Sequence, residues 1–323
     1  MRLGWVIFAS LYCVLTLKAL SLRRGPLEAP PARVSRSVVG TNSAIPPDAG
    51  DGAEALSRPG ANLYARHCAG CHGATGEGDS LAGEMLRPPP RNLVEAEFKF
   101  SSRAVPGLPT DEDLARVIER GLRGTAMPGF ALLRAEEVGA LVAYLKTLSP
   151  RWEEPQEEPI APSEDPWAEN PPAGIALGER IYHLDATCMT CHPSYLSQEA
   201  IDRLAGAEGV LAPRLRPDAF LPVLQESPDG TYVLPPDFRR DRTKTGDAAE
   251  DFFRVISAGI GTTNMPSWAG TLPPEHLWGL AHYLASLAGA RPLLLDAAIY
   301  RPRPALDRPA LSPAEPPAEV FEE

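Results

Sequence analysis

The feature that most constrains this chain is a short box of two cysteines and a histidine that occurs twice. The box CAGCH occupies residues 68–72, and CMTCH occupies residues 188–192. The chain has five cysteines, and four of them lie in these two boxes. In each box two residues separate the thiols, and a histidine follows the second thiol directly. Any fold of this chain must therefore present two such thiol pairs, each beside an imidazole.

Three chemistries use a CxxC pair. A thioredoxin-like redox pair lies at a strand–helix turn within a βαβ pattern, and no such pattern surrounds either box. A zinc site built from two CxxC pairs usually has about 15–20 residues between them, whereas Cys71 and Cys188 are 117 positions apart (188 minus 71). Covalent attachment of a c-type haem uses two thiols followed by the histidine that binds the iron. We therefore favour the haem interpretation for both boxes.

A longer repeat accompanies the boxes. The segments 111–130 and 248–268 align without a gap at a constant offset of 138 positions, so that residues 111–130 correspond to 249–268. The apolar spacing predicts a short helix in each copy that ends at a glycine, Gly121 or Gly259, and a Met-Pro loop follows. Nine residues of the first copy recur in the second: Glu112, Asp113, Arg116, Val117, Ile118, Gly121, Thr125, Met127 and Pro128.

The outer segments of the two copies also correspond. Residues 53–67 and 176–187 run into the boxes, and amphipathic helices are predicted near residues 134–149 and 273–289. The first segments carry Gly60 and Gly178, and the last helices carry Tyr144 and Tyr283. Since a glycine on one helix allows a side chain of another to approach closely, we expect the first and last helices of each copy to cross and pack. The sequence thus predicts two mostly helical domains, at residues 53–149 and 174–290.

The domains resemble small class I cytochrome c domains, and the boxes and the Met-Pro loops are the motifs that carry the resemblance. The resemblance implies an all-α fold around each of two covalently bound haem c groups, a proximal histidine from the box and a distal methionine. Carried over to this chain, the cofactor-binding residues of the first domain are Cys68, Cys71, His72 and Met127, and those of the second are Cys188, Cys191, His192 and Met265. The resemblance implies that the histidines and methionines are the metal ligands, and we expect no catalytic residue.

The family also places a proline carbonyl where it accepts a hydrogen bond from the proximal histidine. The segments PPPRNL (88–93) and LPPDF (234–238) correspond to it, and we expect Pro90 and Pro236 to supply the carbonyls. Two features depart from the family pattern. Pro193 follows the second box where glycine is usual. Pro236 lies 44 positions after His192, whereas Pro90 lies 18 positions after His72. The added residues could cover a haem edge, dock a partner, or form a surface excursion.

The remaining histidines have no counterpart in the other copy. We expect all four to be surface or packing residues and not iron ligands: His67, His183, His276 and His282.

The first 22 residues differ in kind from the rest. An apolar run begins at Leu3, and extended to Leu22 it has 20 residues, about the length that crosses a bilayer core. It also fits a signal peptide with a small-residue site at 19–21. We favour an uncleaved transmembrane anchor over a cleaved signal, and in both cases residues 1–22 are a targeting element.

Proline-rich stretches separate these parts. Residues 23–52, 150–173 and 291–323 are expected to be a linker, an acidic linker and a tail, in a chain with 36 prolines. Residues 150–173 hold seven prolines and seven acidic residues. Segments of this composition bury too little apolar surface to offset chain entropy, so we expect flexible connectors on which the domains swing.

Charge and ligation together suggest the function. The formal net charge of −11 argues against nucleic acid, which needs a basic face. A His/Met iron has no open position for a substrate, so we expect a non-enzymatic carrier of single electrons in a respiratory chain. Its partners would be redox proteins, namely a quinol-oxidising complex, a terminal oxidase or a soluble cytochrome. The resemblance implies attachment to a bacterial cytoplasmic membrane, with the haem domains facing the periplasm or the cell exterior.

Two alternatives remain for the function. The chain also resembles the dihaem subunit of cbb-type oxidases, so it could be the electron-transfer subunit of a larger oxidase or quinol-oxidising complex. It could, less favourably, be a dihaem enzyme such as a peroxidase. An enzyme of that class needs one haem with a labile or different distal ligand, and the sequence carries a Met-Pro loop in both copies.

Overall fold

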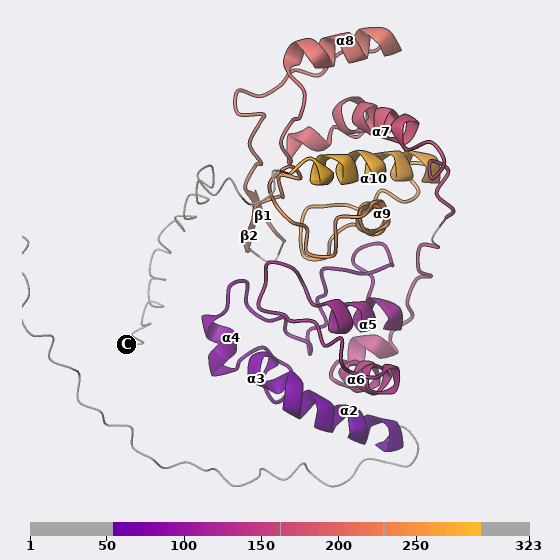
Figure 1. Cartoon of the computed structure of the whole chain (residues 1–323). Helices are drawn as coiled ribbons and strands as arrows, with labels where there is room; N and C mark the ends of the chain where they lie inside the picture. Colours follow the sequence, from indigo (N-terminus) through magenta and orange to yellow (C-terminus); the bar gives the residue numbers. More distant parts are fainter. Residues whose placement is uncertain (1–53, 162, 229, 292–323) are drawn as a thin grey trace, which may run out of the picture. The chain divides into compact units, whose positions relative to one another are not determined.

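The computed structural model describes residues 54–291 apart from 162 and 229, and this part is mostly helical (Figure 1). The predicted anchor 1–22, the linker 23–52 and the tail after residue 291 lie outside the described residues. Within the described part, no helix has both the length and the apolar character needed to cross a membrane. The first domain contains helices α2 (Glu54–His67), α3 (Ala69–His72), α4 (Leu81–Met85), α5 (Asp111–Arg120) and α6 (Ala135–Thr147), followed by the 3-10 turn η1 (Pro150–Glu153).

The second domain has the corresponding elements and some additional ones. Its helices are α7 (Pro171–Arg180), which continues into the π-helix η2 (Ile181–Asp185), the 3-10 turn η3 (Cys188–Thr190), α8 (Gln198–Glu208), α9 (Ala249–Ala258) and α10 (Pro274–Gly289). The strands β1 (Gln225–Glu226) and β2 (Tyr232–Val233) pair antiparallel. The described part is thus mostly helical, as the sequence predicted. One short hairpin in the second domain was not predicted.

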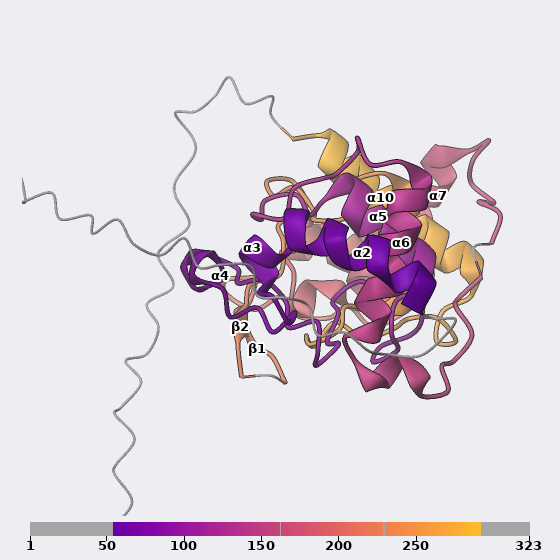
Figure 2. The same cartoon turned by 90° about the horizontal axis from the view of Figure 1, so that it is seen from below.

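The first and last helices of each domain cross at a glycine, as the sequence predicted. Helix α2 packs on α6, and α7 packs on α10 (Figures 1 and 2). A Cβ atom added to Gly60 would lie 2.1 Å from the carbonyl oxygen of Ala140, and one added to Gly178 would lie 2.1 Å from that of Gly279. No real Cβ atom approaches a carbonyl so closely, so both crossings require glycine. Each crossing fixes the segment that leads into a box.

The shorter helices α5 and α9 are stopped by the predicted glycines. Gly121 has φ 66° and Gly259 has φ 80°, conformations that glycine adopts at no steric cost. At the other end of α5, the Thr110 side chain accepts from the backbone of Asp113, whose carboxylate accepts from the Thr110 backbone. This capping box fixes where the helix begins.

The linker 150–173 is not the loose connector that its composition predicted. In its first half, the Ile160 N–H donates to the carbonyl oxygen of Ser102 at 2.8 Å, and the Glu157 carbonyl accepts from Arg103 Nε at 2.6 Å. These bonds attach the linker to the first domain. Proline-rich chain lacks some N–H donors, but its carbonyls still accept hydrogen bonds.

The second half of the linker is attached to helix α10. Trp167 Nε1 donates to the carbonyl oxygen of Glu275 at 2.8 Å, and Trp278 Nε1 donates to Ser163 Oγ at 3.0 Å. Asp165 lies 2.8 Å from His282 Nε2. One tryptophan and two polar side chains therefore dock a segment that has few apolar residues, and the expectation of a freely swinging linker is wrong for this stretch.

Candidate functional site

The two Cys-Cys-His boxes have closely similar backbone turns. In the first, the N–H groups of Cys71 and His72 both donate to the carbonyl oxygen of Cys68, at 3.0 and 2.9 Å. In the second, the N–H groups of Cys191 and His192 donate to that of Cys188, at 3.2 and 3.0 Å. A single helical turn thus brings both thiols and the imidazole together. The four thiols are free of disulfides and partly buried.

Each box histidine is held by a backbone carbonyl. His72 Nδ1 lies 3.1 Å from the carbonyl oxygen of Arg91, and His192 Nδ1 lies 3.1 Å from that of Pro236. Because a carbonyl oxygen only accepts, Nδ1 carries the proton and Nε2 keeps its lone pair for a metal. Pro236 is the predicted acceptor. Pro90 is not, because the carbonyl of the next residue, Arg91, takes that position.

A tyrosine supports the backbone just after each box. The Tyr64 hydroxyl donates to the carbonyl oxygen of Gly73, and the Tyr182 hydroxyl donates to that of Pro193, both at 2.8 Å. Gly73 has φ 81°, which proline does not reach. The loop after the second box therefore follows a different path, as the Pro193 departure suggested, while the tyrosine bond is retained.

The two Met-Pro loops have matching hydrogen bonds. The N–H of Met127 donates to Thr125 Oγ1 at 3.1 Å, and that of Met265 donates to Thr263 Oγ1 at 3.2 Å. Each threonine hydroxyl donates in turn to the carbonyl at the start of its loop. The sequence alone does not predict this role of the threonines, although their recurrence in the repeat is a signal that marks them.

The helix-ending glycines allow these loops to fold back. The carbonyl oxygen of Met127 accepts from the Leu122 N–H at 3.1 Å, and that of Met265 accepts from the Ile260 N–H at 3.1 Å. A Cβ atom on Gly121 would lie 2.6 Å from the Met127 oxygen, and one on Gly259 would lie 2.8 Å from the Met265 oxygen. Each glycine is therefore part of the structure that holds a methionine in place.

Burial keeps the site residues in their neutral forms. It raises the pKa of the Cys68 thiol to about 11 and that of the Cys188 thiol to about 12. It also lowers the pKa of His72 and of His192, against the opposing effect of their carbonyl bonds. Neutral imidazole is the form that ligates a metal. The imidazoles are thus in the form that can bind an iron.

These features fit a c-type haem in each domain. Two free thiols, an imidazole with an available Nε2, and a methionine on a glycine-dependent loop form the donor set that such a haem requires. The aromatic setting is suitable too, since Phe238 stacks on His192 with ring centroids 4.9 Å apart. The two domains thus present this set with matching backbone hydrogen bonds, and the assignment of Met127 and Met265 as iron ligands stays a prediction.

The other four histidines have different surroundings. His183 is fully buried, with Nδ1 2.8 Å from the carbonyl oxygen of Glu179 and Nε2 accepting from the Tyr195 N–H at 3.4 Å. His282 contacts Asp165 of the linker, and His67 packs edge-on against Phe130. His276 is half-buried on α10.

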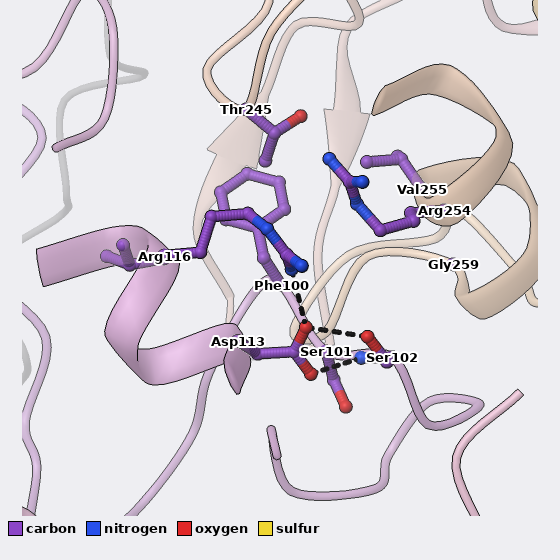
Figure 3. A pocket seen from close by; sticks show the side chains of 10 residues that line it. Phe100, Ser101, Ser102, Asp113, Arg116, Thr245, Arg254, Val255 and Gly259 are labelled. Atoms are coloured by element: carbon purple, nitrogen blue, oxygen red, sulfur yellow. Dashed lines mark hydrogen bonds and ion pairs between the residues drawn. The ribbon is translucent and has the colours of Figure 1, made fainter. Parts of the chain in front are cut away.

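A separate small cavity lies beside α5 and α9 (Figure 3). Its volume is about 40 Å³, which holds about three waters and not a haem. Figure 3 shows Asp113 at its lower end, with its carboxylate oxygens 2.6 Å from Ser102 N, 2.6 Å from Ser102 Oγ and 3.1 Å from Arg116 Nη1. Arg254, which recurs from Arg116 in the repeat, pairs in the same way with Asp251. We read the cavity as structural.

Comparison with known families identifies both domains. Residues 57–149 match the family model described as cytochrome c. Residues 173–284 match the model described as cytochrome c oxidase, cbb3-type, subunit III. No curated protein matches the chain significantly.

A solved structure matches over both domains together. It is a chain of the Kuenenia stuttgartiensis reducing HAO-like protein complex Kustc0457/Kustc0458, with 30% sequence identity and a TM-score of 0.53. The match covers 71% of this chain and 96% of that chain. The protein belongs to the dihaem c-type cytochromes, with two cytochrome c domains in one chain. Such domains transfer electrons, and the pairs Cys68/Cys71 and Cys188/Cys191 fit covalent haem attachment.

Proposed function

We propose that this protein carries single electrons between redox partners of a respiratory chain, through two haems of closed His/Met ligation. His72 and Met127 would ligate one iron, and His192 and Met265 the other. The observation that supports this proposal is the matching construction of the two Met-Pro loops, because each threonine and each helix-ending glycine fixes the methionine backbone in the same way.

The expected chemistry follows from this ligand set. A His/Met haem iron changes oxidation state by one electron, and methionine ligation raises its potential. The chain's residues position the ligands, keep the imidazoles neutral and exclude water. The acidic surface, with a net charge of −11, would speed association with basic partners.

The first experiment is an optical spectrum of the purified holoprotein, with haem quantified per chain, before and after carbon monoxide. We expect two covalent haems per chain and a ferrous spectrum that carbon monoxide leaves unchanged. A protein without covalent haem would overturn the proposal. Carbon monoxide binding to one haem of the wild-type protein would indicate an open or labile distal position and favour the enzyme alternative.

The matched ligand variants are Met127→Ala and Met265→Ala. Each is expected to open one iron, so that carbon monoxide changes the spectrum of about half of the haem. The control is Met85→Ala, a methionine of α4 that is 78% exposed and is not a proposed ligand. If the two ligand variants behaved like this control, the methionine assignment would be wrong.

A second candidate role is the electron-transfer subunit of a larger complex. Two similarities favour it: the second domain matches subunit III of cbb3-type oxidases, and the solved neighbour is part of a complex. Under this proposal, residues 1–22 would anchor the chain in a bacterial cytoplasmic membrane, with the haem domains facing the periplasm or the cell exterior. Mild detergent extraction and native separation test it. Migration with a quinol-oxidising complex or terminal oxidase supports the subunit role, and migration alone supports a free carrier.

A further inference from the structure

An inserted segment distinguishes the second haem domain from the first. Residues 197–233 lie between His192 and Pro236, where the first domain has a much shorter connection from His72 to Arg91. The segment contains α8, a loop and the hairpin β1–β2. In Figure 1 it runs in salmon and orange from α8 to the hairpin.

The middle of the segment is bonded to the haem-binding box. The Val223 N–H donates to the carbonyl oxygen of Cys191 at 2.8 Å, and the carbonyl oxygen of Ala219 accepts from the Ser194 N–H at 2.6 Å. These two bonds flank His192 in the sequence. The segment therefore runs along the side of the site from which the proximal histidine comes.

Three residues further on, the same segment is bonded to the methionine loop. Asn264 Nδ2 donates to the carbonyl oxygen of Glu226 at 2.8 Å, and Asn264 directly precedes Met265. Glu226 belongs to β1, whose pairing with Tyr232 fixes its backbone. The hairpin thus presents a rigid carbonyl to the loop that carries the proposed distal ligand.

One of these contacts lies beside the proposed proximal histidine, and the other lies beside the proposed distal methionine. Extended backbone advances about 3.3 Å per residue, so the stretch from Val223 to Glu226 spans about 10 Å. If His192 and Met265 bind one iron from opposite faces, a flat haem lies between them. A chain bonded beside both ligands then passes across an edge of that haem. This step rests on the proposed function.

The first domain lacks this arrangement. There the carbonyl oxygen of Cys71 accepts from the Ser80 hydroxyl at 2.8 Å, a side chain close in sequence. The position that corresponds to Asn264 is Ala126 (264 minus 138), whose side chain has no amide group to donate a hydrogen bond. The bond from Val223 to the box and the bond from Asn264 to the hairpin are therefore specific to the second domain.

We propose that residues 223–226 form a strap over one haem edge of the second domain and restrict access of external redox partners to that haem. The strap excludes water from the edge, which disfavours the more highly charged ferric state and contributes to a higher potential. The haem of the first domain, without a strap, is the one that exchanges electrons faster with external reductants. The insertion thus makes two otherwise similar domains unequal.

The test is stopped-flow reduction of the ferric full-length holoprotein by ascorbate, which gives up one electron for each iron reduced. We expect a fast phase from the first domain and a slow phase from the second. Asn264→Ala removes one attachment of the strap, and replacing residues 223–233 by a shorter Gly-Ser linker removes the strap itself. The linker variant is expected to speed the slow phase about tenfold, which corresponds to about 1.4 kcal/mol in activation free energy.

Potentiometric titration provides the second readout, because electron exchange between the haems could merge the phases. One of the two potentials is expected to fall in both variants. The matched control is Ala126→Asn in the first domain, which should change neither rate nor potential. Unchanged rates and potentials in both variants, each with two haems per chain, would overturn the strap. A wild-type protein without two closed haems would refute the proposed function instead.

Discussion

The Cβ atom of Tyr283 lies 2.7 Å from the point where Gly178 would carry a side chain. The tyrosine ring packs edge-on against Tyr182, with ring centroids 5.6 Å apart, and the Tyr182 hydroxyl supports the loop after the second box. A glycine contact between α7 and α10 is therefore connected, through two aromatic rings, to the backbone that positions His192.

Gly178→Ala is expected to destabilise the second domain. The new methyl would force the helices apart, and overpacking of this kind costs about 1–3 kcal/mol, more than the gain of roughly 1 kcal/mol in helix propensity. Denaturant unfolding followed by the haem spectrum measures the change. The control is Gly206→Ala on α8, where an added Cβ meets nothing within 4 Å, and this variant should be as stable as the wild type or more stable. Equal effects of the two substitutions would contradict the close crossing.

Gly259→Ala is expected to loosen the methionine loop of the second domain. Its φ of 80° disfavours a side chain, and the new methyl would also press on the Met265 carbonyl oxygen. We expect the ferrous variant to bind carbon monoxide at one haem. Gly270→Ala separates the two causes, because Gly270 has φ 82° with nothing within 4 Å of an added Cβ. It should lose stability without binding carbon monoxide. If both variants bound carbon monoxide, backbone strain alone would explain the opened haem, and the contact with the Met265 oxygen would not be needed.

The ends of the short helices and the turns of the boxes could be predicted from the sequence, because each depends on a few neighbouring residues. A helix that ends at Gly121 or Gly259 and a box followed by histidine can be read from spacing, and the structure has both. The proline carbonyl was harder to predict. In the first domain a run of prolines precedes Arg91, so several adjacent carbonyls were candidates, and the three-dimensional path of the loop selects between them.

The linker and the insertion show where composition misleads. Residues 150–173 have the proline and acidic content of a free connector, yet Trp167 and Asp165 dock on α10 through contacts that sequence spacing does not reveal. The strands of the hairpin are two residues each, too short for a period-2 pattern to show. Both features depend on contacts with distant parts of the chain.

Buried His183 is expected to make the second domain sensitive to mild acid. Burial lowers its pKa to about 4; the bond to the Glu179 carbonyl opposes this shift and the Arg239 charge adds to it. The unfolded chain, with an ordinary pKa near 6.5, binds more protons between these values. The stabilisation is therefore complete above about pH 6.5 and is lost as the pH falls towards 4. The loss amounts to about 3 kcal/mol by proton linkage.

Unfolding free energies measured from pH 7 to pH 4.5 test this prediction, with His183→Gln as the variant. The glutamine should lower stability at pH 7 and flatten the pH dependence. His67→Gln is the control, because the His67 side chain is exposed and packs edge-on against Phe130. This variant should keep the wild-type slope of stability against pH. An unchanged slope in His183→Gln would show that another group causes the acid sensitivity.

Trp167→Ala tests whether the linker is docked in solution. The indole is partly buried against the core of the second domain, covers Gly174 and donates to the Glu275 carbonyl. Its loss removes a large apolar contact, and we expect the segment around residues 158–170 to be cut faster by a protease of broad specificity. The fold of the domain should persist, because α7 and α10 still cross at Gly178. Trp152→Ala, in the turn that follows the first domain, is the matched tryptophan control and should leave the cutting of residues 158–170 unchanged. If the wild-type linker were cut as fast as that of Trp167→Ala, the segment would be a free connector, and its attachment to α10 would not hold the domain boundary in place.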